Sequence, residues 1–198
     1  FLGRPDDTPA GDAFERRLYV CRRTIEKKAD AEFALRDKIF YVCSMSSRTI
    51  VYKGMLVATQ MRRFFIDLND AAVKTAVALV HSRYSTNTTP SWERAHPNRF
   101  IIHNGEINTL KGNVNWIRAR EPNLYSPVLQ HDLERVMPII NREGSDSAIL
   151  DNVLEFLVMN GRPLTRAASM LLPEPWDHND NLSEERRAYD AYQSMLME

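Results

Sequence analysis

Three short polar strings stand next to segments that their residue patterns predict to be rigid. The first, His81-Ser82-Arg83-Tyr84-Ser85-Thr86-Asn87, follows the apolar residues 76–80; the second, His103-Asn104-Gly105-Glu106-Ile107-Asn108-Thr109, follows residues 100–102. The third, Gly144-Ser145-Asp146-Ser147, opens a segment with apolar residues at helical spacing. Polar side chains at the end of a buried strand or the start of a helix keep the fixed geometry that binding and catalysis require. Together the strings supply a guanidinium, a carboxylate, and an amide beside a glycine, which suits binding of a free amino acid and stabilisation of an oxyanion.

Arg83 and Asp146 are the charged members of these strings. A guanidinium at a strand end can bind a carboxylate through two parallel hydrogen bonds, and Asp146 can accept hydrogen bonds from an ammonium group. Used together, the two side chains would bind both ends of an α-amino acid. Each also has an ordinary structural interpretation: a solvated or ion-paired arginine, and an acid that stabilises the N-terminus of a helix.

Asn104 and Gly105 are the candidates for transition-state stabilisation. A side-chain amide and a neighbouring backbone N–H that no Cβ shields can both point at one developing oxyanion. The alternative is an Asn-Gly turn. Their place between the apolar residues 100–102 and the polar residues 106–109 favours the catalytic interpretation.

No residue of the chain is a convincing nucleophile or metal ligand. The five histidines have no metal-ligand spacing, so a metal site is not expected, and His81 and His103 are interpreted as hydrogen-bonded residues at sheet ends. Cys21 lies on an expected apolar helix face and Cys43 in an expected strand, so both are interpreted as buried hydrophobic residues rather than reactive thiols.

Composition limits the class of protein. The chain has 198 residues, of which 43% are hydrophobic and 26% charged, enough for one sizeable globular domain. The 26 basic and 26 acidic residues balance, which gives no reason to expect binding to nucleic acid or to an anionic membrane. No apolar run approaches the roughly 20 residues of a membrane span. Two unpaired cysteines fit a reducing compartment, either the cytoplasm or an organelle stroma.

The elements expected from the pattern group as strands and then helices. Apolar residues at helical spacing give the first helix an expected apolar face of Phe14, Leu18, Cys21 and Ile25, and Asn160-Gly161 is a natural left-handed helix end. Helices are expected at residues 12–28, 60–65, 110–119, 147–159, 164–172 and from Ser183 onward. Strands are expected at residues 38–45, 49–53, 75–81 and 99–103, the first two as a hairpin. Antiparallel strands with helices grouped after them favour an α+β fold.

Longer strings around these residues resemble one family. They are residues 81–92 (HSRYSTNTTPSW), 103–116 (HNGEINTLKGNVNW), 47–55 and 172–176. With them the chain, from about Phe14 onward, resembles the class II glutamine amidotransferase domain of glutamate synthase large subunits, a domain with an N-terminal nucleophile. The resemblance implies an N-terminal-nucleophile hydrolase fold, an αββα layered sandwich with antiparallel sheets, incomplete in this chain. It makes residues 1–198 part of a single domain, with residues 1–12 disordered or linker-like.

The resemblance also assigns roles. Arg83 would bind the α-carboxylate of glutamine and Asp146 its α-ammonium group. Asn104 and Gly105 would form the oxyanion hole. The remaining pocket residues would be Tyr84, Thr86 and Asn87. The family's nucleophile is an N-terminal cysteine whose thiolate attacks the glutamine amide, releasing ammonia and leaving a thioester that water hydrolyses to glutamate.

This sequence departs from that pattern because residue 1 is Phe. We therefore expect an internal piece of the domain, cut at both ends, that does not hydrolyse glutamine alone. In the parent enzyme the resemblance implies that ammonia reaches a synthase domain and reacts with 2-oxoglutarate. FMN, an iron–sulfur cluster and an electron donor, an NADPH or NADH subunit or ferredoxin, would serve that domain. No cofactor is expected within this part.

Other functions stay open. The chain could be an amino-acid-binding module without chemistry, or the glutaminase part of another class II amidotransferase that feeds a sugar phosphate or a purine precursor; the longer strings argue against the latter. A hydrolase that uses Cys21 or Cys43 is a remote alternative.

Overall fold

The computed structural model describes residues 2–32, 40–82, 89–105, 107 and 110–196. These residues form helices and irregular segments, with no strand among them. The α-helices are α1 (Asp12–Glu32), α2 (Ala58–Phe64), α3 (Leu110–Arg120), α4 (Leu133–Val136), α5 (Asp146–Met159), α6 (Leu164–Leu171) and α7 (Glu184–Met195). Short 3-10 helices are η1 (Ile66–Asn69), η2 (Trp92–Arg94), η3 (Glu121–Asn123) and η4 (Gln130–Asp132). None of the described helices has the length and apolarity that crossing a bilayer requires.

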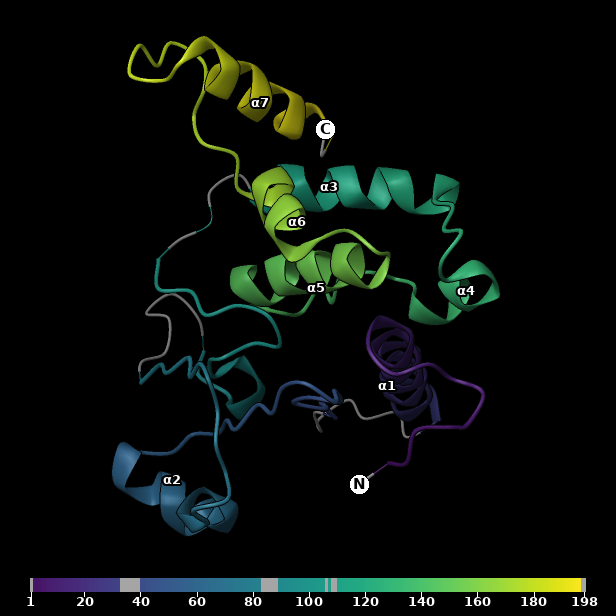
Figure 1. Cartoon of the computed structure of the whole chain (residues 1–198), viewed down its shortest axis with the longest axis vertical. Coiled ribbons are helices and arrows are strands. Elements are labelled where there is room, and N and C mark those ends of the chain that lie inside the picture. The colour runs from purple at the N-terminus through teal and green to yellow at the C-terminus, as the bar shows by residue number, and fades with distance from the viewer. Residues whose placement is uncertain (1, 33–39, 83–88, 106, 108–109, 197–198) are drawn as a thin grey trace.

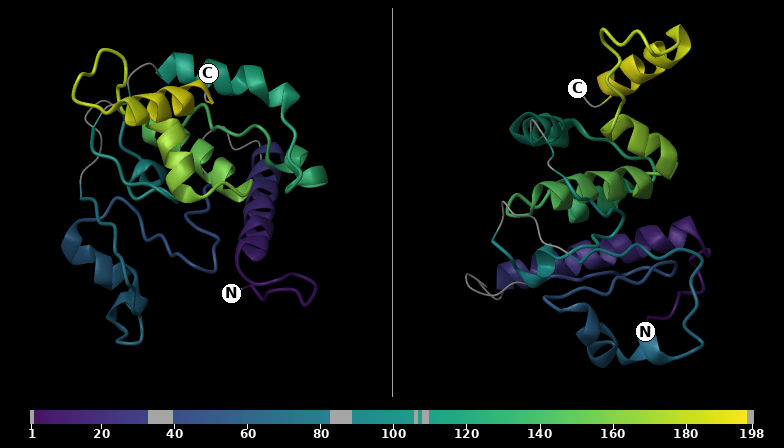
Figure 2. Two further views of the ribbon diagram at one scale, coloured as in Figure 1. Left: turned by 45° about the horizontal axis from the view of Figure 1, so that its top comes forward. Right: turned by 90° about the vertical axis from the view of Figure 1, so that its left-hand side faces the viewer.

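Helix α5 is the centre of the molecule. It lies between α1 on one side and α6 on the other, with α7 packed on the far side of α6 (Figure 1). The side view shows α1, α5 and α7 as successive layers, with α2 set apart beyond α1 (Figure 2). The apolar core lies where α1, α4 and α5 meet, and its most deeply buried members include Val136, Ile140 and Tyr19.

Capping residues in the sequence mark where the helices begin and end. The Ser145 hydroxyl caps α5 by accepting from the Ala148 N–H, and Ser183 caps α7 by accepting from the Arg186 N–H. Gly161 follows α5 with φ of +87°, the left-handed exit that the sequence predicts. The six helices expected from the sequence are therefore confirmed, while the short α4 was not expected.

The prediction of an αββα sandwich is wrong for the described residues. Extended segments need a neighbouring strand to take their backbone hydrogen bonds. Residues 75–80 have no such backbone partner in the part of the chain that the structure describes, and Val77 and Val80 are 73% and 83% exposed. At residue 77 a side chain takes the place of a neighbouring strand, because the Thr75 hydroxyl accepts a hydrogen bond from the Val77 N–H and donates one to the Val77 carbonyl oxygen.

The expected hairpin around residues 46–48 is also wrong. The chain does double back, but serine hydroxyls rather than a strand ladder take the backbone donors. Ser44 Oγ accepts from the Val51 N–H, and Ser46 Oγ accepts from the N–H groups of Arg48 and Thr49. Serine side chains compete with secondary structure in this way because they offer the backbone a local partner. Residues 38 and 39 of the first expected strand lie outside the described residues.

The expected strand at residues 99–103 is replaced by a loop fixed to α5. One carboxylate, that of Asp151, accepts three successive backbone N–H groups. Its Oδ2 lies 3.1 Å from Arg99 N, and its Oδ1 lies 2.7 Å from Phe100 N and 3.0 Å from Ile101 N. Successive amides in a strand point to opposite sides, so a segment that directs three of them at one carboxylate cannot be a strand.

The buried face of α1 differs from the expected one. Of the four residues expected there, Cys21 is exposed and Ile25 is 38% exposed. Leu18 is buried as expected, and the other buried residues of the helix are Glu15, Tyr19, Val20, Arg22, Glu26 and Ala29. The charged members of this face are buried because they have ion-pair or hydrogen-bond partners, which a count of apolar residues cannot detect.

Candidate functional site

The third polar string forms the N-terminus of α5 and contacts the second string. Asp146, the first residue of the helix, accepts from the Ser147 N–H at 2.6 Å through Oδ1 and from the Ile107 N–H at 3.2 Å through Oδ2. Its carboxylate is half-buried. Asp146 thereby ties the helix N-terminus to the segment that carries Asn104 and Gly105, two strings that are 39 residues apart at this contact.

Gly144 allows the turn before α5 to lie close to the first turn of that helix. A Cβ at Gly144 would lie 3.1 Å from the Asn141 carbonyl oxygen and 3.2 Å from the Ala148 Cβ. Both distances are tighter than ordinary contacts, and neither backbone carbonyl nor helix can move cheaply. A glycine at this position lets the preceding turn pack directly on the first turn of α5.

Asn104 and Gly105 are exposed. The position of Gly105 lies close to the His103 imidazole, because a Cβ built on Gly105 would be 3.4 Å from His103 Nε2. Gly105 is therefore next to both solvent and an imidazole, and Asn104 precedes it at the surface.

His96 contacts the first and the third string. Its ring centroid lies 4.8 Å from that of His81, and its Nε2 lies 3.3 Å from the Ser147 hydroxyl oxygen. His81 begins the first string and Ser147 ends the third. His103, which begins the second, acts on His96 electrostatically by lowering its pKa.

The His96 imidazole is held neutral. Burial, together with the electrostatic effects of His81, Lys53 and His103, lowers its pKa to about 4 against the opposing effect of Asp146. Its Nδ1 is buried without a hydrogen-bond partner among the described residues. Lys53 is itself buried, with Nζ 3.4 Å from the Pro97 carbonyl oxygen, and burial lowers its pKa to about 8.

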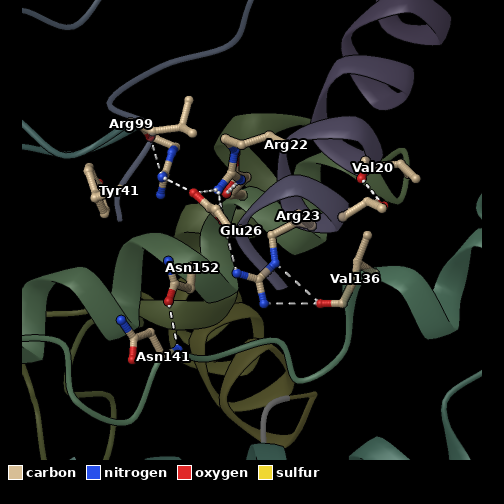
Figure 3. A network of polar contacts seen from close by, with 12 residues as sticks. Val20, Arg22, Arg23, Glu26, Tyr41, Arg99, Val136, Asn141 and Asn152 are labelled. Atoms are coloured by element: carbon tan, nitrogen blue, oxygen red, sulfur yellow. Dashed lines mark hydrogen bonds and ion pairs between the residues drawn. The ribbon is translucent and has the colours of Figure 1, made fainter. Parts of the chain in front are cut away.

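The loop at residues 99–101 is held to α1 by a buried ion network (Figure 3). Arg99 Nη2 donates to Glu26 Oε1 at 2.9 Å and to the Val42 carbonyl oxygen at 2.5 Å. Arg22 donates to both Glu26 oxygens, at 3.1 and 2.9 Å, and its Nη2 lies 2.5 Å from Glu155 Oε2. Arg22 is 1% exposed, so each of these charges depends on its partners for stability.

The predicted site residues are thus only partly placed. The structure brings Asp146 together with the 103–109 string, and Asn104 and Gly105 are at the surface. Arg83, Tyr84, Thr86 and Asn87 lie outside the described residues. The described His, Cys, Asp and Glu side chains include no group of three placed to hold a metal ion.

Sequence reasoning missed His96 and Asp151 and misjudged Cys21. His96 belongs to no recognisable spacing, and its position between the first two strings was the one available signal. Asp151 lies mid-helix among apolar residues, where an acid with 1% exposure must have a buried partner. Cys21, expected to be buried, is exposed, whereas Cys43 is half-buried and burial raises the pKa of its thiol.

A shallow hollow of about 220 Å³ lies elsewhere, between α1 and Arg135 of α4. None of the predicted site residues lines it. It therefore adds nothing to the site at the N-terminus of α5.

The comparisons with known proteins all match this chain to the same family. The profile of the glutamine amidotransferases class-II matches residues 1–198. The chain is 52% identical, over all its 198 residues, to the glutamate synthase [NADPH] large chain of Bacillus subtilis, covering 13% of that protein. It is 46% identical over 188 residues, 94% of the chain, to the glutamate synthase [NADH] of Schizosaccharomyces pombe, covering 9%. It is 42% identical over 189 residues, 93% of the chain, to the chloroplastic ferredoxin-dependent glutamate synthase of Oryza sativa, covering 12%. The chain thus spans about a tenth of the length of these relatives.

Proposed function

Because this chain belongs to the class II glutamine amidotransferases, as a part of their glutamate synthase branch, we propose that it forms the glutamine-binding part of a domain that hydrolyses glutamine to glutamate and ammonia. The observation that carries the proposal is the family match over residues 1–198. The contact of Asp146 with the string that contains Asn104 and Gly105 supports it.

We assign the binding of glutamine to two charged side chains. Asp146 accepts hydrogen bonds from the α-ammonium group, and Arg83 binds the α-carboxylate bidentately. Support for the first assignment is the half-buried carboxylate of Asp146, which its backbone contacts orient at the start of α5. Tyr84, Thr86 and Asn87 line the same pocket by their place in the string that begins at His81.

Asn104 and Gly105 stabilise the oxyanion that forms when the glutamine amide carbon becomes tetrahedral. Both are exposed at the end of the loop that Asp151 anchors, so they are accessible to a substrate held at Asp146. Removing one oxyanion-hole donor typically lowers kcat by about 10²–10³-fold. Neither cysteine of the chain is given the role of nucleophile, since Cys21 lies on α1, outside the candidate site, and burial raises the pKa of the Cys43 thiol.

The ammonia serves a synthase reaction in the parent protein, the reductive amination of 2-oxoglutarate, with electrons from a reduced nicotinamide subunit or from ferredoxin. The residues of this chain do not fit the iron–sulfur cluster of that reaction. An iron–sulfur cluster needs about four thiolates, whereas the chain has two cysteines, on α1 and in a separate segment. We place this cluster and the FMN in other parts of the parent. A cytoplasmic or plastid location accords with the chloroplastic relative.

The test is kinetic and uses the whole parent enzyme. Asp146→Asn and Arg83→Gln should each raise KM for glutamine, and Asn104→Ala should lower kcat for ammonia release from glutamine by about 10²–10³-fold. Ammonia-dependent glutamate synthesis should persist in all three variants, because it bypasses this site. Unchanged KM and kcat for glutamine in all three would contradict the proposal. Glutamine binding without any hydrolysis in the wild-type enzyme would favour a non-catalytic binding module.

A further inference from the structure

We propose that Asp151 of α5 is a positioning residue for the oxyanion hole, acting through the three backbone N–H groups that it accepts. The inference rests on the proposed role of Asn104 and Gly105. It assigns to a buried carboxylate, five residues into α5, the task of holding the loop that carries those donors.

The geometry at Asp151 requires a carboxylate. Its two oxygens accept from Arg99, Phe100 and Ile101 at 2.7 to 3.1 Å. An asparagine in its place would offer one acceptor oxygen and would direct an NH₂ group at one or more of these donors. The residue that is closest in shape therefore loses the interaction.

The anchored amides are close in sequence to the proposed oxyanion donors. From Ile101 to Asn104 the chain advances three residues, which span at most about 10 Å. The Asn98 N–H donates to the Ile101 carbonyl at 2.9 Å and closes the loop on its other side. Because only two residues separate Ile101 from Asn104, a displacement of Ile101 should also displace Asn104.

A second anchor holds the same loop through a side chain. Arg99 gives its backbone N–H to Asp151 and its guanidinium to Glu26 of α1, with the Tyr41 ring 4.5 Å away. Glu26 is in turn bound by Arg22, which also binds Glu155, one turn beyond Asp151 on α5. Figure 3 shows Arg99, Glu26 and Arg22 meeting between the two helices. The loop is thus fixed to α1 and α5 at once.

Helix α5 also fixes the distance between the two halves of the site. Asp146, the proposed ammonium acceptor, and Asp151 lie on the same helix, about 7.5 Å apart along its axis at 1.5 Å per residue. One rigid element therefore orients the group that binds the substrate amine and the loop that meets its amide. A displacement of about 1 Å between such groups can cost on the order of 10²-fold in rate.

The experiment compares Asp151→Asn with Asp190→Asn in the whole parent enzyme. Asp190 is a matched control because it is equally buried, at 1% exposure, and hydrogen-bonded, with Oδ2 2.7 Å from Arg186 Nε, but on α7. We expect Asp151→Asn to lower kcat for glutamine hydrolysis by about 10²-fold while KM for glutamine stays near the wild-type value. Amide hydrogen exchange of residues 99–101 should accelerate in this variant. Asp190→Asn should leave both the kcat and this exchange unchanged.

Further outcomes would contradict either this inference or the proposed function. If exchange at residues 99–101 accelerates and kcat stays unchanged, Asp151 anchors the loop without positioning the donors, and the inference is wrong. If Asn104→Ala lowers kcat and Asp151→Asn does not, only the inference fails, whereas an unaffected Asn104→Ala variant removes the proposed function itself. Should Asp151→Asn not fold, Asp151→Glu provides the second variant, because it keeps the carboxylate and displaces it by one methylene group; its kcat is expected to fall with KM retained, and an unchanged kcat would overturn the inference.

Discussion

Glu26 is the residue on which the buried ion network depends most, and Glu26→Gln tests that dependence. Its carboxylate contacts three guanidinium groups, those of Arg22, Arg23 and Arg99, at 2.9, 3.2 and 2.9 Å. Replacing it by Gln keeps the shape and removes the charge. Of the contacts described above, Arg22 then keeps the Glu155 carboxylate, and Arg99 keeps the Val42 carbonyl oxygen and the Tyr41 ring.

The expected cost follows from burial. Removing one partner of a buried ion pair costs about 3–5 kcal/mol because it leaves a buried charge without compensation. For a chain of this size each kcal/mol lowers Tm by about 2–4 °C, so Tm should fall by roughly 6–20 °C. The matched control is Arg48→Gln, which breaks the pair with Asp12 whose side chains are 55% and 72% exposed. An exposed pair contributes about 0–1 kcal/mol.

Acid titration of the same two proteins checks the cause. Burial alone would raise the pKa of Glu26, but Arg22, Arg99 and Arg23 outweigh it and lower the pKa below the ordinary 4.5. A carboxyl whose pKa is lower in the folded state stabilises the protein above about 4.5 and loses this contribution as pH falls through the lowered value. The Gln variant should lack this part of the acid dependence. A loss of Tm no larger than that of Arg48→Gln would refute the reasoning.

Three smaller predictions concern single residues. Because burial lowers the His96 pKa to about 4, the NMR signals of its ring should not titrate between pH 5 and 8. Any stability that His96 contributes should be complete above pH 6.5 and be lost as pH falls toward 4. A titration midpoint of the ring signals near pH 6.5 would contradict its burial. Gly161→Ala forces a Cβ into a position with φ of +87° and should lower the free energy of unfolding by about 1–2 kcal/mol in urea titrations, whereas Ala at an exposed helical site should not. Cys21 is exposed while burial raises the Cys43 pKa, so iodoacetamide should alkylate Cys21 first, as peptide mass spectrometry would show; the reverse order would place Cys21 in the core.

The helices could be predicted because their signals are local. Ser145, Ser183 and Gly161 mark ends by contacts within four residues, which the sequence displays directly. The strands could not be predicted from β-branched residues alone, because a strand exists only through its partner. At residues 99–101 the partner of the backbone is the Asp151 side chain, 50 to 52 residues away. No local sequence pattern predicts a contact between residues so far apart in the chain.

The arrangement of the candidate site could be predicted only in part. Asp146 contacts the string of Asn104 and Gly105 through Ile107, while the roles given to these residues stay predictions. His96, which is half-buried, and the charged face of α1 were missed, since the partners of each are distant in sequence. Arg22, for example, meets Glu155 across 133 positions.

The pairing of residues from both ends of the chain has a consequence for biosynthesis. The loop before Asn104 leaves the ribosome well ahead of α5, yet the carboxylate that holds its backbone, that of Asp151, is translated later. Contacts of such long sequence separation form slowly and late. The nascent loop must therefore wait for its support until α5 has emerged and docked on α1.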